Sequence, residues 1–193
     1  MIDAILKKVR GLITNPLGTF RNSRGDDARS VFHYFLVLLL VDALLTAIIS
    51  LTGLGPWGTV VRFLRLRHPV LVFFLVLVGG LILAPLFSAW LHLWVYMLGG
   101  RKGFVQSLKA VMYGATPGLL LGWIPFIGII FHLWSMVLAI FGIHELHEIE
   151  ADRAAFAVIV AVIIPLVILA LVAAWLLVAS VNLTVPAERP GLL

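Results

Sequence analysis

Four ionisable side chains lie within otherwise apolar stretches of the sequence, and they are the first candidates for chemistry. They are Asp42, His92, Lys109 and His132. Ionisable groups are costly inside a bilayer, and those that occur there often mark ion paths or proton relays. Helical rise places them about 13, 10, 9 and 16 Å from the predicted inner membrane boundary, so all four are expected in the inner half.

Two interpretations of this polar cluster follow from its composition. One is an inward-facing polar cavity, which would suit a small transporter or channel. The other is a buried polar tie that fixes helix register, in which Asp42 pairs with Lys109 or a histidine. We favour the tie because one acid and one lysine are enough to form it.

A second candidate for chemistry is the run His144-Glu145-Leu146-His147-Glu148. On a helix, His144, His147 and Glu148 would share a face and could bind zinc, which would suit a metal-dependent membrane enzyme. The histidines are three residues apart rather than four, so the run differs from HExxH and Glu145 has no assigned catalytic place. We expect a solvated polar connector with no metal and no cofactor.

Composition identifies the environment in which these side chains must work. The chain has 193 residues, 62% of them hydrophobic and 12% charged, with no cysteine and a net charge of +5. Such a chain is expected to be an integral membrane protein with most of its mass in the bilayer. Its basic charge is then expected to set orientation rather than nucleic-acid binding. No serine of the predicted spans has a GxSxG context, so nucleophilic catalysis is not expected.

The stretch from Gly103 to Ile143 cannot be a single transmembrane helix. A helix of that length would run about 60 Å, twice the hydrocarbon core of roughly 30 Å. The stretch must fold back at its glycine and proline cluster, where Pro125 and Gly128 are the expected turn residues. We therefore predict an all-α fold with five transmembrane helices, of which the third and fourth form a tight hairpin.

The predicted elements follow from hydrophobic periodicity and length. Residues 2–13 form an amphipathic helix that is expected to lie among the headgroups of an anionic leaflet. The five spans are predicted at 33–54, 70–98, 104–121, 126–142 and 154–181. The connector 55–69 is interfacial, as either a loop or an in-plane helix. We divide the chain into a cytoplasmic segment 1–30, a membrane domain 31–183 and an external tail 184–193.

Charge distribution predicts the orientation. With the N-terminus inside, the inner segments hold ten Lys and Arg residues and the outer segments hold four, of the 14 in the chain. The positive-inside rule then places the N-terminus in the cytoplasm and the C-terminus outside.

Three glycines at every fourth position, Gly114, Gly118 and Gly122, form a small-residue ridge on the predicted third span. Such a ridge lets another helix approach closely. The ridge could mediate homo-oligomers, but we favour packing against another span of the same chain.

An ordered set of residues resembles the Yip family of five-span membrane proteins, which are named for interaction with Ypt/Rab GTPases. The set comprises Asn15-Pro16 with Phe20, Gly99-Gly100 with Phe104, Lys109-Ala110, Tyr113, Pro117, the Pro125/Gly128 turn, Trp134 and Gly142. The resemblance implies a polytopic helical domain without catalytic activity, acting in membrane organisation or trafficking through protein contacts. About thirty residues precede the first span, fewer than in GTPase-linked eukaryotic members. We therefore expect a prokaryotic-type member in the cell membrane, with GTPase binding in doubt.

The resemblance and the residues together predict a non-enzymatic scaffold or adaptor. It would contact lipid and a protein partner through its cytoplasmic face, residues 1–30, 99–103 and 144–153. The alternatives are the transporter built on Asp42, His92, Lys109 and His132, and the metal-dependent enzyme at His144 and His147.

Overall fold

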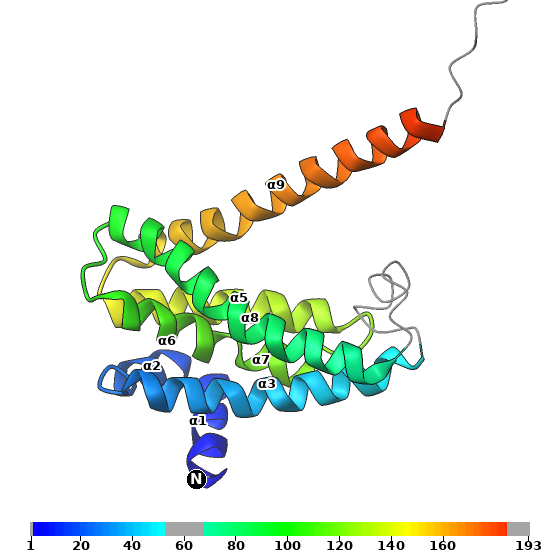
Figure 1. The fold of residues 1–193 in the computed structure, drawn as a ribbon. Coiled ribbons are helices and arrows are strands. Elements are labelled where there is room, and N and C mark those ends of the chain that lie inside the picture. The colour runs from blue at the N-terminus through cyan, green and yellow to red at the C-terminus, as the bar shows by residue number, and fades with distance from the viewer. Residues whose placement is uncertain (1, 53–67, 185–193) are drawn as a thin grey trace, which may run out of the picture.

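The computed structural model describes residues 2–52 and 68–184, and every regular element in those ranges is a helix (Figure 1). The helices are α1 (Ile2–Thr14), α2 (Pro16–Asn22), α3 (Ala28–Ser50), α5 (Pro69–Met97), α6 (Phe104–Gly114), α7 (Thr116–Leu121), α8 (Gly128–His147) and α9 (Ala151–Thr184). The connector predicted at 55–69 falls almost wholly outside the described residues, as does nearly all of the predicted tail 184–193.

Four of these helices, α3, α5, α8 and α9, are long and apolar enough to cross a membrane. They correspond to the predicted first, second, fourth and fifth spans. A chain with several such helices is a polytopic membrane protein. The predicted third span, 104–121, differs from expectation because it is divided into α6 and α7 at Ala115.

The division between α6 and α7 has a local cause. Pro117 has no backbone N–H, so it cannot donate to the carbonyl of Tyr113 four residues earlier. The hydroxyl of Thr116 donates to that carbonyl instead, at 2.6 Å. Helical bonds continue on both sides, from Ala115 N to Val111 O and from Leu119 N to Ala115 O, each at 2.9 Å. Helical bonding therefore resumes beyond Pro117, and one backbone bond is replaced by a side-chain bond.

The packed body consists of α3, α5, α6, α7 and α8. Both α6 and α7 lie against α8, and α3 lies against α5, α6 and α7 (Figure 1). Apolar side chains from facing helices fill the interior, and Leu91, Met112, Leu138 and Ile143 are wholly buried. The polar side chains described below are held in place by this core.

The long helix α9 packs against the body only near its beginning. Ala154, Ala157 and Ala161 are buried there, and the indole of Trp90 donates to the carbonyl of Ala161 at 3.0 Å. Farther along, α9 leaves the body (Figure 1), and Leu169 and Trp175 are 65% and 68% exposed. Hydrocarbon is the expected surrounding for such a surface.

The N-terminal segment is built into the domain by two caps and two buried side chains. Asn15 caps α2 by accepting from the N–H of Gly18 at 3.1 Å, and Asp27 caps α3 by accepting from the N–H of Ser30 at 3.3 Å. The bond to Ser30 lowers the pKa of Asp27 below its ordinary value. Leu12 and Phe20 are wholly buried. The segment is thus a packed part of the domain, whichever side of the membrane it occupies.

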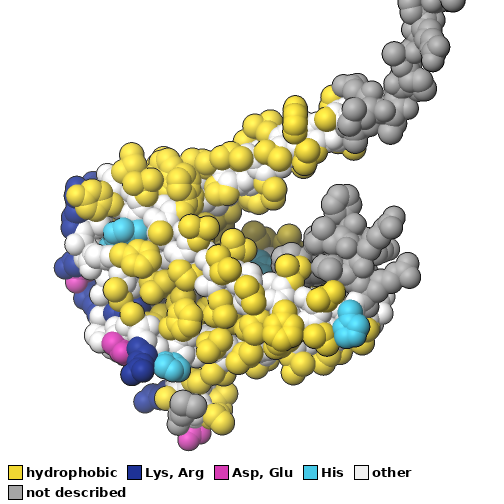
Figure 2. Space-filling model, viewed as in Figure 1, with side chains coloured by type: hydrophobic (Ala, Val, Ile, Leu, Met, Phe, Trp, Pro, Cys, Tyr) yellow, Lys and Arg dark blue, Asp and Glu magenta, His cyan; other side chains and the backbone are white. Residues whose placement is uncertain are grey.

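Charged side chains gather at one end of the body. Figure 2 shows Lys, Arg, Asp and Glu mainly at the left of the view, while hydrophobic side chains cover the rest of that face. This charged end is formed by α1, α2, the start of α3, the loop at 99–103 and the end of α8. We call it the polar end.

Candidate functional site

Glu145 anchors the polar end by joining the N-terminal segment to α8. Its carboxylate is buried and accepts two hydrogen bonds from Arg21, from Nε at 3.1 Å and from Nη2 at 2.9 Å. Arg24 donates Nε and Nη2 to the backbone carbonyl of Glu145, at 3.0 and 2.7 Å. Paired bonds from an arginine to a carboxylate fix orientation as well as proximity. The contact therefore holds two segments that lie far apart in the sequence.

Glu148 extends this network at the end of α8. It pairs with Arg24 at 2.9 Å and with the ammonium of Lys102 in the loop after α5. The hydrogen bond from Lys102, with its charge, lowers the pKa of Glu148. Its backbone is left-handed, with φ of 56°, where α8 ends. The geometry turns the chain out of the helix and leaves the carboxylate between two cations.

Asp26 makes the second junction, between α1 and α6. One of its carboxylate oxygens accepts from Lys8 at 2.7 Å and from the hydroxyl of Tyr113 at 2.6 Å. The ammonium of Lys8 also donates to Ser23 at 2.7 Å and lies 4.8 Å from the centre of the Tyr113 ring. A cation over an aromatic ring adds to the ion pair. Lys8 is therefore turned inward and holds α1 to the body.

A buried hydrogen-bonded chain joins α5, α6 and α8 at the same end. The hydroxyl of Ser107 lies 2.9 Å from Nδ1 of His92 and 2.9 Å from Nε2 of His147. Ser107 is wholly buried and His147 is 2% exposed. A hydroxyl has one proton, so it can donate to one ring while it accepts from the other. The hydroxyl can therefore bond both rings at once, which ties α5 and α8 to α6.

The structure separates the four ionisable residues that the sequence grouped. Lys109 donates to the backbone carbonyl of Arg24 at 2.7 Å, and His92 belongs to the chain with Ser107. Asp42 has Thr46, on its own helix, as its hydrogen-bond partner at 3.5 Å. The expected pairing of Asp42 with Lys109 or a histidine is therefore wrong, because residues from the N-terminal segment satisfy Lys109.

His132 is also separated from the others. It lies fifteen residues before His147 on α8, which corresponds to about 22 Å along the helix. His92 neighbours His147 through Ser107, so His132 lies far along α8 from His92. The structure therefore does not bring the four residues together, and the inward-facing cavity stays a prediction.

The predicted metal ligands also diverge. His147 faces Ser107, Glu148 faces Arg24 and Lys102, and Nδ1 of His144 bonds with the carbonyl of Ile149 at 2.6 Å. Within residues 2–52 and 68–184, no three His, Cys, Asp or Glu side chains are gathered as a metal site. The shared face predicted for His144, His147 and Glu148 is not formed, because α8 ends between the second histidine and the glutamate.

The glycine ridge lies against α8. A Cβ added to Gly114 would meet the backbone of Ala139 at 3.0 Å. At Gly118 it would meet His132 at 2.9 Å and Ser135 at 3.0 Å, and the N–H of Gly118 donates to the hydroxyl of Ser135 at 2.9 Å. The ridge is thus occupied by a helix of the same chain, where small residues permit close packing.

The turn before α8 contains both predicted turn residues. Ile127 N donates to the carbonyl of Pro125 at 2.8 Å, and Gly128 N donates to the carbonyl of Ile124 at 2.9 Å. Phe126 adopts a left-handed φ of 67° and is 87% exposed. Two tight backbone bonds therefore close the turn, and a large aromatic side chain projects from it.

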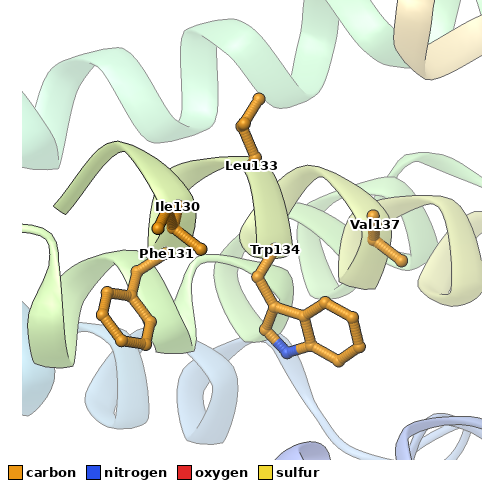
Figure 3. Close-up of a pocket in the computed structure, with 5 residues that line it drawn as sticks. All are labelled: Ile130, Phe131, Leu133, Trp134 and Val137. Atoms are coloured by element: carbon orange, nitrogen blue, oxygen red, sulfur yellow. The ribbon is translucent and has the colours of Figure 1, made fainter. Parts of the chain in front are cut away.

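A shallow apolar hollow lies on the exposed side of α8, away from the polar end. It is lined by Ile130, Phe131, Leu133, Trp134 and Val137. Figure 3 shows Phe131 and Trp134 pointing to one side of the helix and Leu133 to the other. These side chains offer almost no polar contact, so the hollow is suited to hydrocarbon rather than to a polar ligand.

Sequence reasoning missed most of the residues that build the polar end. Arg21, Arg24 and Asp26 were placed only in the cytoplasmic segment 1–30, and Ser107 only in the predicted third span. Charge complementarity between the basic segment 21–29 and the acidic segment 145–150 was a signal for the first contact. The partnership of Ser107 with two histidines had no such signal, because it depends on how three helices meet.

A comparison with protein families finds that the Yip1 domain model matches residues 10–181. No curated protein matches the chain, and no solved structure does. The matched range includes most of the polar end as well as the helices that carry it.

Proposed function

The chain belongs to the Yip1 domain family, and from that premise we propose that it is a non-enzymatic membrane scaffold or adaptor. It acts in membrane organisation or trafficking by binding another protein at the polar end. The observation that carries this proposal is the cross-linked network of Arg21, Arg24 and Glu145, which gives the polar end a fixed shape. A preorganised charged surface loses little entropy when a partner binds.

The proposed arrangement has five crossings, with α6 and α7 together as the third. Their range, 104–121, is about 27 Å long as a helix, close to the thickness of the hydrocarbon core. The tight turn at Pro125 and Gly128 supports a hairpin with α8. We place the N-terminus in the cytoplasm of a cell and the C-terminus outside, with α1 in the interface, because the polar end carries the excess of Lys and Arg.

The proposed partner is a protein rather than a nucleic acid. A GTPase of the Ypt/Rab type is one class that the family implies, and a second copy of the chain is another. A partner for the polar end must match a surface on which acidic and basic side chains alternate. Electrostatic matching of this kind raises the association rate and excludes partners of the wrong charge pattern.

Affinity purification of the tagged protein from native membranes in mild detergent tests the proposal. The test variants are Arg29→Glu at the start of α3 and Asp152→Lys at the start of α9, beside the polar end; both parent side chains are exposed. The control is Phe126→Ala, in the turn that precedes α8. We expect a protein that copurifies with the wild type and the control but is depleted from the test variants. Recovery of the tagged protein alone in every case would overturn the proposal.

A further inference from the structure

The helix α1 has three distinct faces, where its sequence indicates only two. One face packs on the body, with Leu12 wholly buried and Lys8 bound to Asp26. A second face is apolar but uncovered: Ile2, Leu6 and Ile13 are 70%, 59% and 50% exposed. Residues four and seven positions apart share one side of a helix, so these three form a continuous strip. The strip is available to something outside the chain.

The third face of α1 is cationic and exposed. Lys7 and Arg10 lie three residues apart, and both are exposed to solvent. Asp3 is the single acidic residue of α1, so this face retains a positive excess. Lys8 differs from Lys7 because its charge is used inside the protein. The sequence alone does not distinguish these two adjacent lysines.

The direction of α1 determines what its free faces meet. Figure 1 shows α1 running across the direction of α3, and α3 is one of the helices able to span a membrane. A helix that lies across a spanning helix runs parallel to the membrane plane. In Figure 2 the part of the molecule that α1 forms has hydrophobic side chains facing the apolar surface and Lys or Arg nearer the polar end. The uncovered strip is therefore directed to the hydrocarbon and the cations to the headgroups.

We propose that α1 is a binding site for acidic phospholipid, with Lys7 and Arg10 contacting the phosphate groups and Ile2, Leu6 and Ile13 inserted among the upper acyl chains. This inference rests on the proposed arrangement of the chain in the membrane. The occupant is assigned as acidic lipid because an apolar strip beside two unpaired cations matches the chemistry of an anionic interface. The body holds α1 in place through Lys8, so the helix need not fold when lipid binds.

The absence of cysteine permits a direct test with single labelled positions. We would introduce Leu6→Cys on the apolar strip and, separately, Thr14→Cys on an exposed polar position of the same helix. Each purified protein, labelled with an environment-sensitive fluorophore, would be placed in vesicles of phosphatidylcholine, with or without phosphatidylserine. We expect the label at position 6 to be quenched by lipid-borne quenchers, more strongly when phosphatidylserine is present, and the label at position 14 to remain in water.

The charge dependence is tested by Lys7→Ser with Arg10→Ser. Each cation near an anionic surface strengthens association about fivefold. The preference of α1 for vesicles with phosphatidylserine over vesicles without it should therefore fall about 25-fold in the double variant. The matched control is Arg29→Ser with Arg101→Ser, which removes two exposed arginines outside α1 and should retain that preference. An unchanged unfolding temperature would show that the variants fold.

Two results would overturn the lipid assignment. One is a label at position 6 that is equally exposed to water in both kinds of vesicle. The other is a response to phosphatidylserine that survives removal of Lys7 and Arg10. Because the purified protein is tested without any partner, failure of the adaptor proposal would leave this experiment unaffected. Failure of the lipid proposal would likewise leave the copurification result standing.

Discussion

The polar end and the remainder of the bundle are held together by different means. At the polar end, side chains from segments that lie far apart in the sequence meet through ion pairs and hydrogen bonds, as between Arg21 and Glu145. In the apolar part, the contacts are close approaches of small residues, as between Gly114 and Ala139. Lipid is as apolar as leucine, so burial gives helices little reason to associate in a bilayer. The comparison teaches that this chain fixes its helices laterally by packing and fixes their ends by charge.

Among the substitutions that test this difference, Glu145→Ala is expected to have the largest effect on stability. The change removes the buried carboxylate to which Arg21 and Arg24 bind, and we expect the free energy of unfolding to fall by about 3 kcal/mol. That value is at the low end for a buried pair because both arginines remain partly in water. Reversible unfolding in detergent micelles would measure it.

The matched control is Glu150→Ala. Glu150 pairs with Arg153 at 3.2 Å, but its side chain is 71% exposed. We expect a change below about 0.5 kcal/mol, as for most exposed pairs. Equal effects of the two substitutions would show that the buried carboxylate of Glu145 contributes no more than an exposed ion pair.

In the apolar part, Gly114→Val should have the next largest effect. Its side chain would be forced against the backbone of Ala139, and overpacking of this kind costs about 2 kcal/mol. The control is Gly79→Ala, because a Cβ added there meets nothing within 4 Å beyond its chain neighbours and the backbone of its own helix. A neutral or slightly stabilising result is expected for the control, and similar losses at both glycines would contradict close packing as the cause.

Ser107→Ala sharpens the comparison within the polar end. It removes the hydroxyl between His92 and His147 and should cost about 1 kcal/mol, the usual scale for a hydrogen bond between membrane helices. Ser88→Ala is matched in burial, but its hydroxyl donates to the carbonyl of Ala84 on its own helix. We expect unfolding measurements to show a smaller loss for Ser88→Ala, since no second helix is involved.

The smallest effect concerns the acid sensitivity of the polar end. Bonding to Ser30 lowers the pKa of Asp27 from its ordinary value of 3.8, so the folded state favours the carboxylate. The resulting stability is present above that ordinary value and is lost as pH falls through the lower, folded pKa. Asp27→Asn retains a capping side chain but cannot titrate. Unfolding curves should show the same stability at neutral pH and a slightly weaker decline in acid.

Several elements of the fold were predictable because they depend on local sequence. The amphipathic spacing of residues 2–13 matches α1, and the apolar runs match four helices able to span a membrane. The division of the third span at Ala115 was not predicted, although Pro117 marks it. Proline inside a span is often tolerated when another group bonds the carbonyl it leaves free, and here the hydroxyl of Thr116 does so.

The site was much less predictable, because its contacts join distant parts of the chain. Lys109 was recognised as costly in an apolar stretch, but its partner, the carbonyl of Arg24, has no sequence signal. Asp42 was assigned to Lys109 or a histidine by charge alone, whereas the structure gives Lys109 a backbone partner and Asp42 the hydroxyl of Thr46. Residue type therefore indicated which groups needed partners, and tertiary packing determined which partners they received.

The bond between Arg21 and Glu145 has a consequence for the order of biosynthesis. The two residues are separated by 124 positions. At about 5–20 residues per second, a ribosome takes roughly 6–25 s to reach Glu145 after making Arg21. During that interval Arg21 and Arg24 have no carboxylate from α8 to bind, and their charges are available to retain the N-terminal segment on its own side of the membrane. The arginines that bind α8 in the finished bundle thus have no α8 partner while the first helices insert.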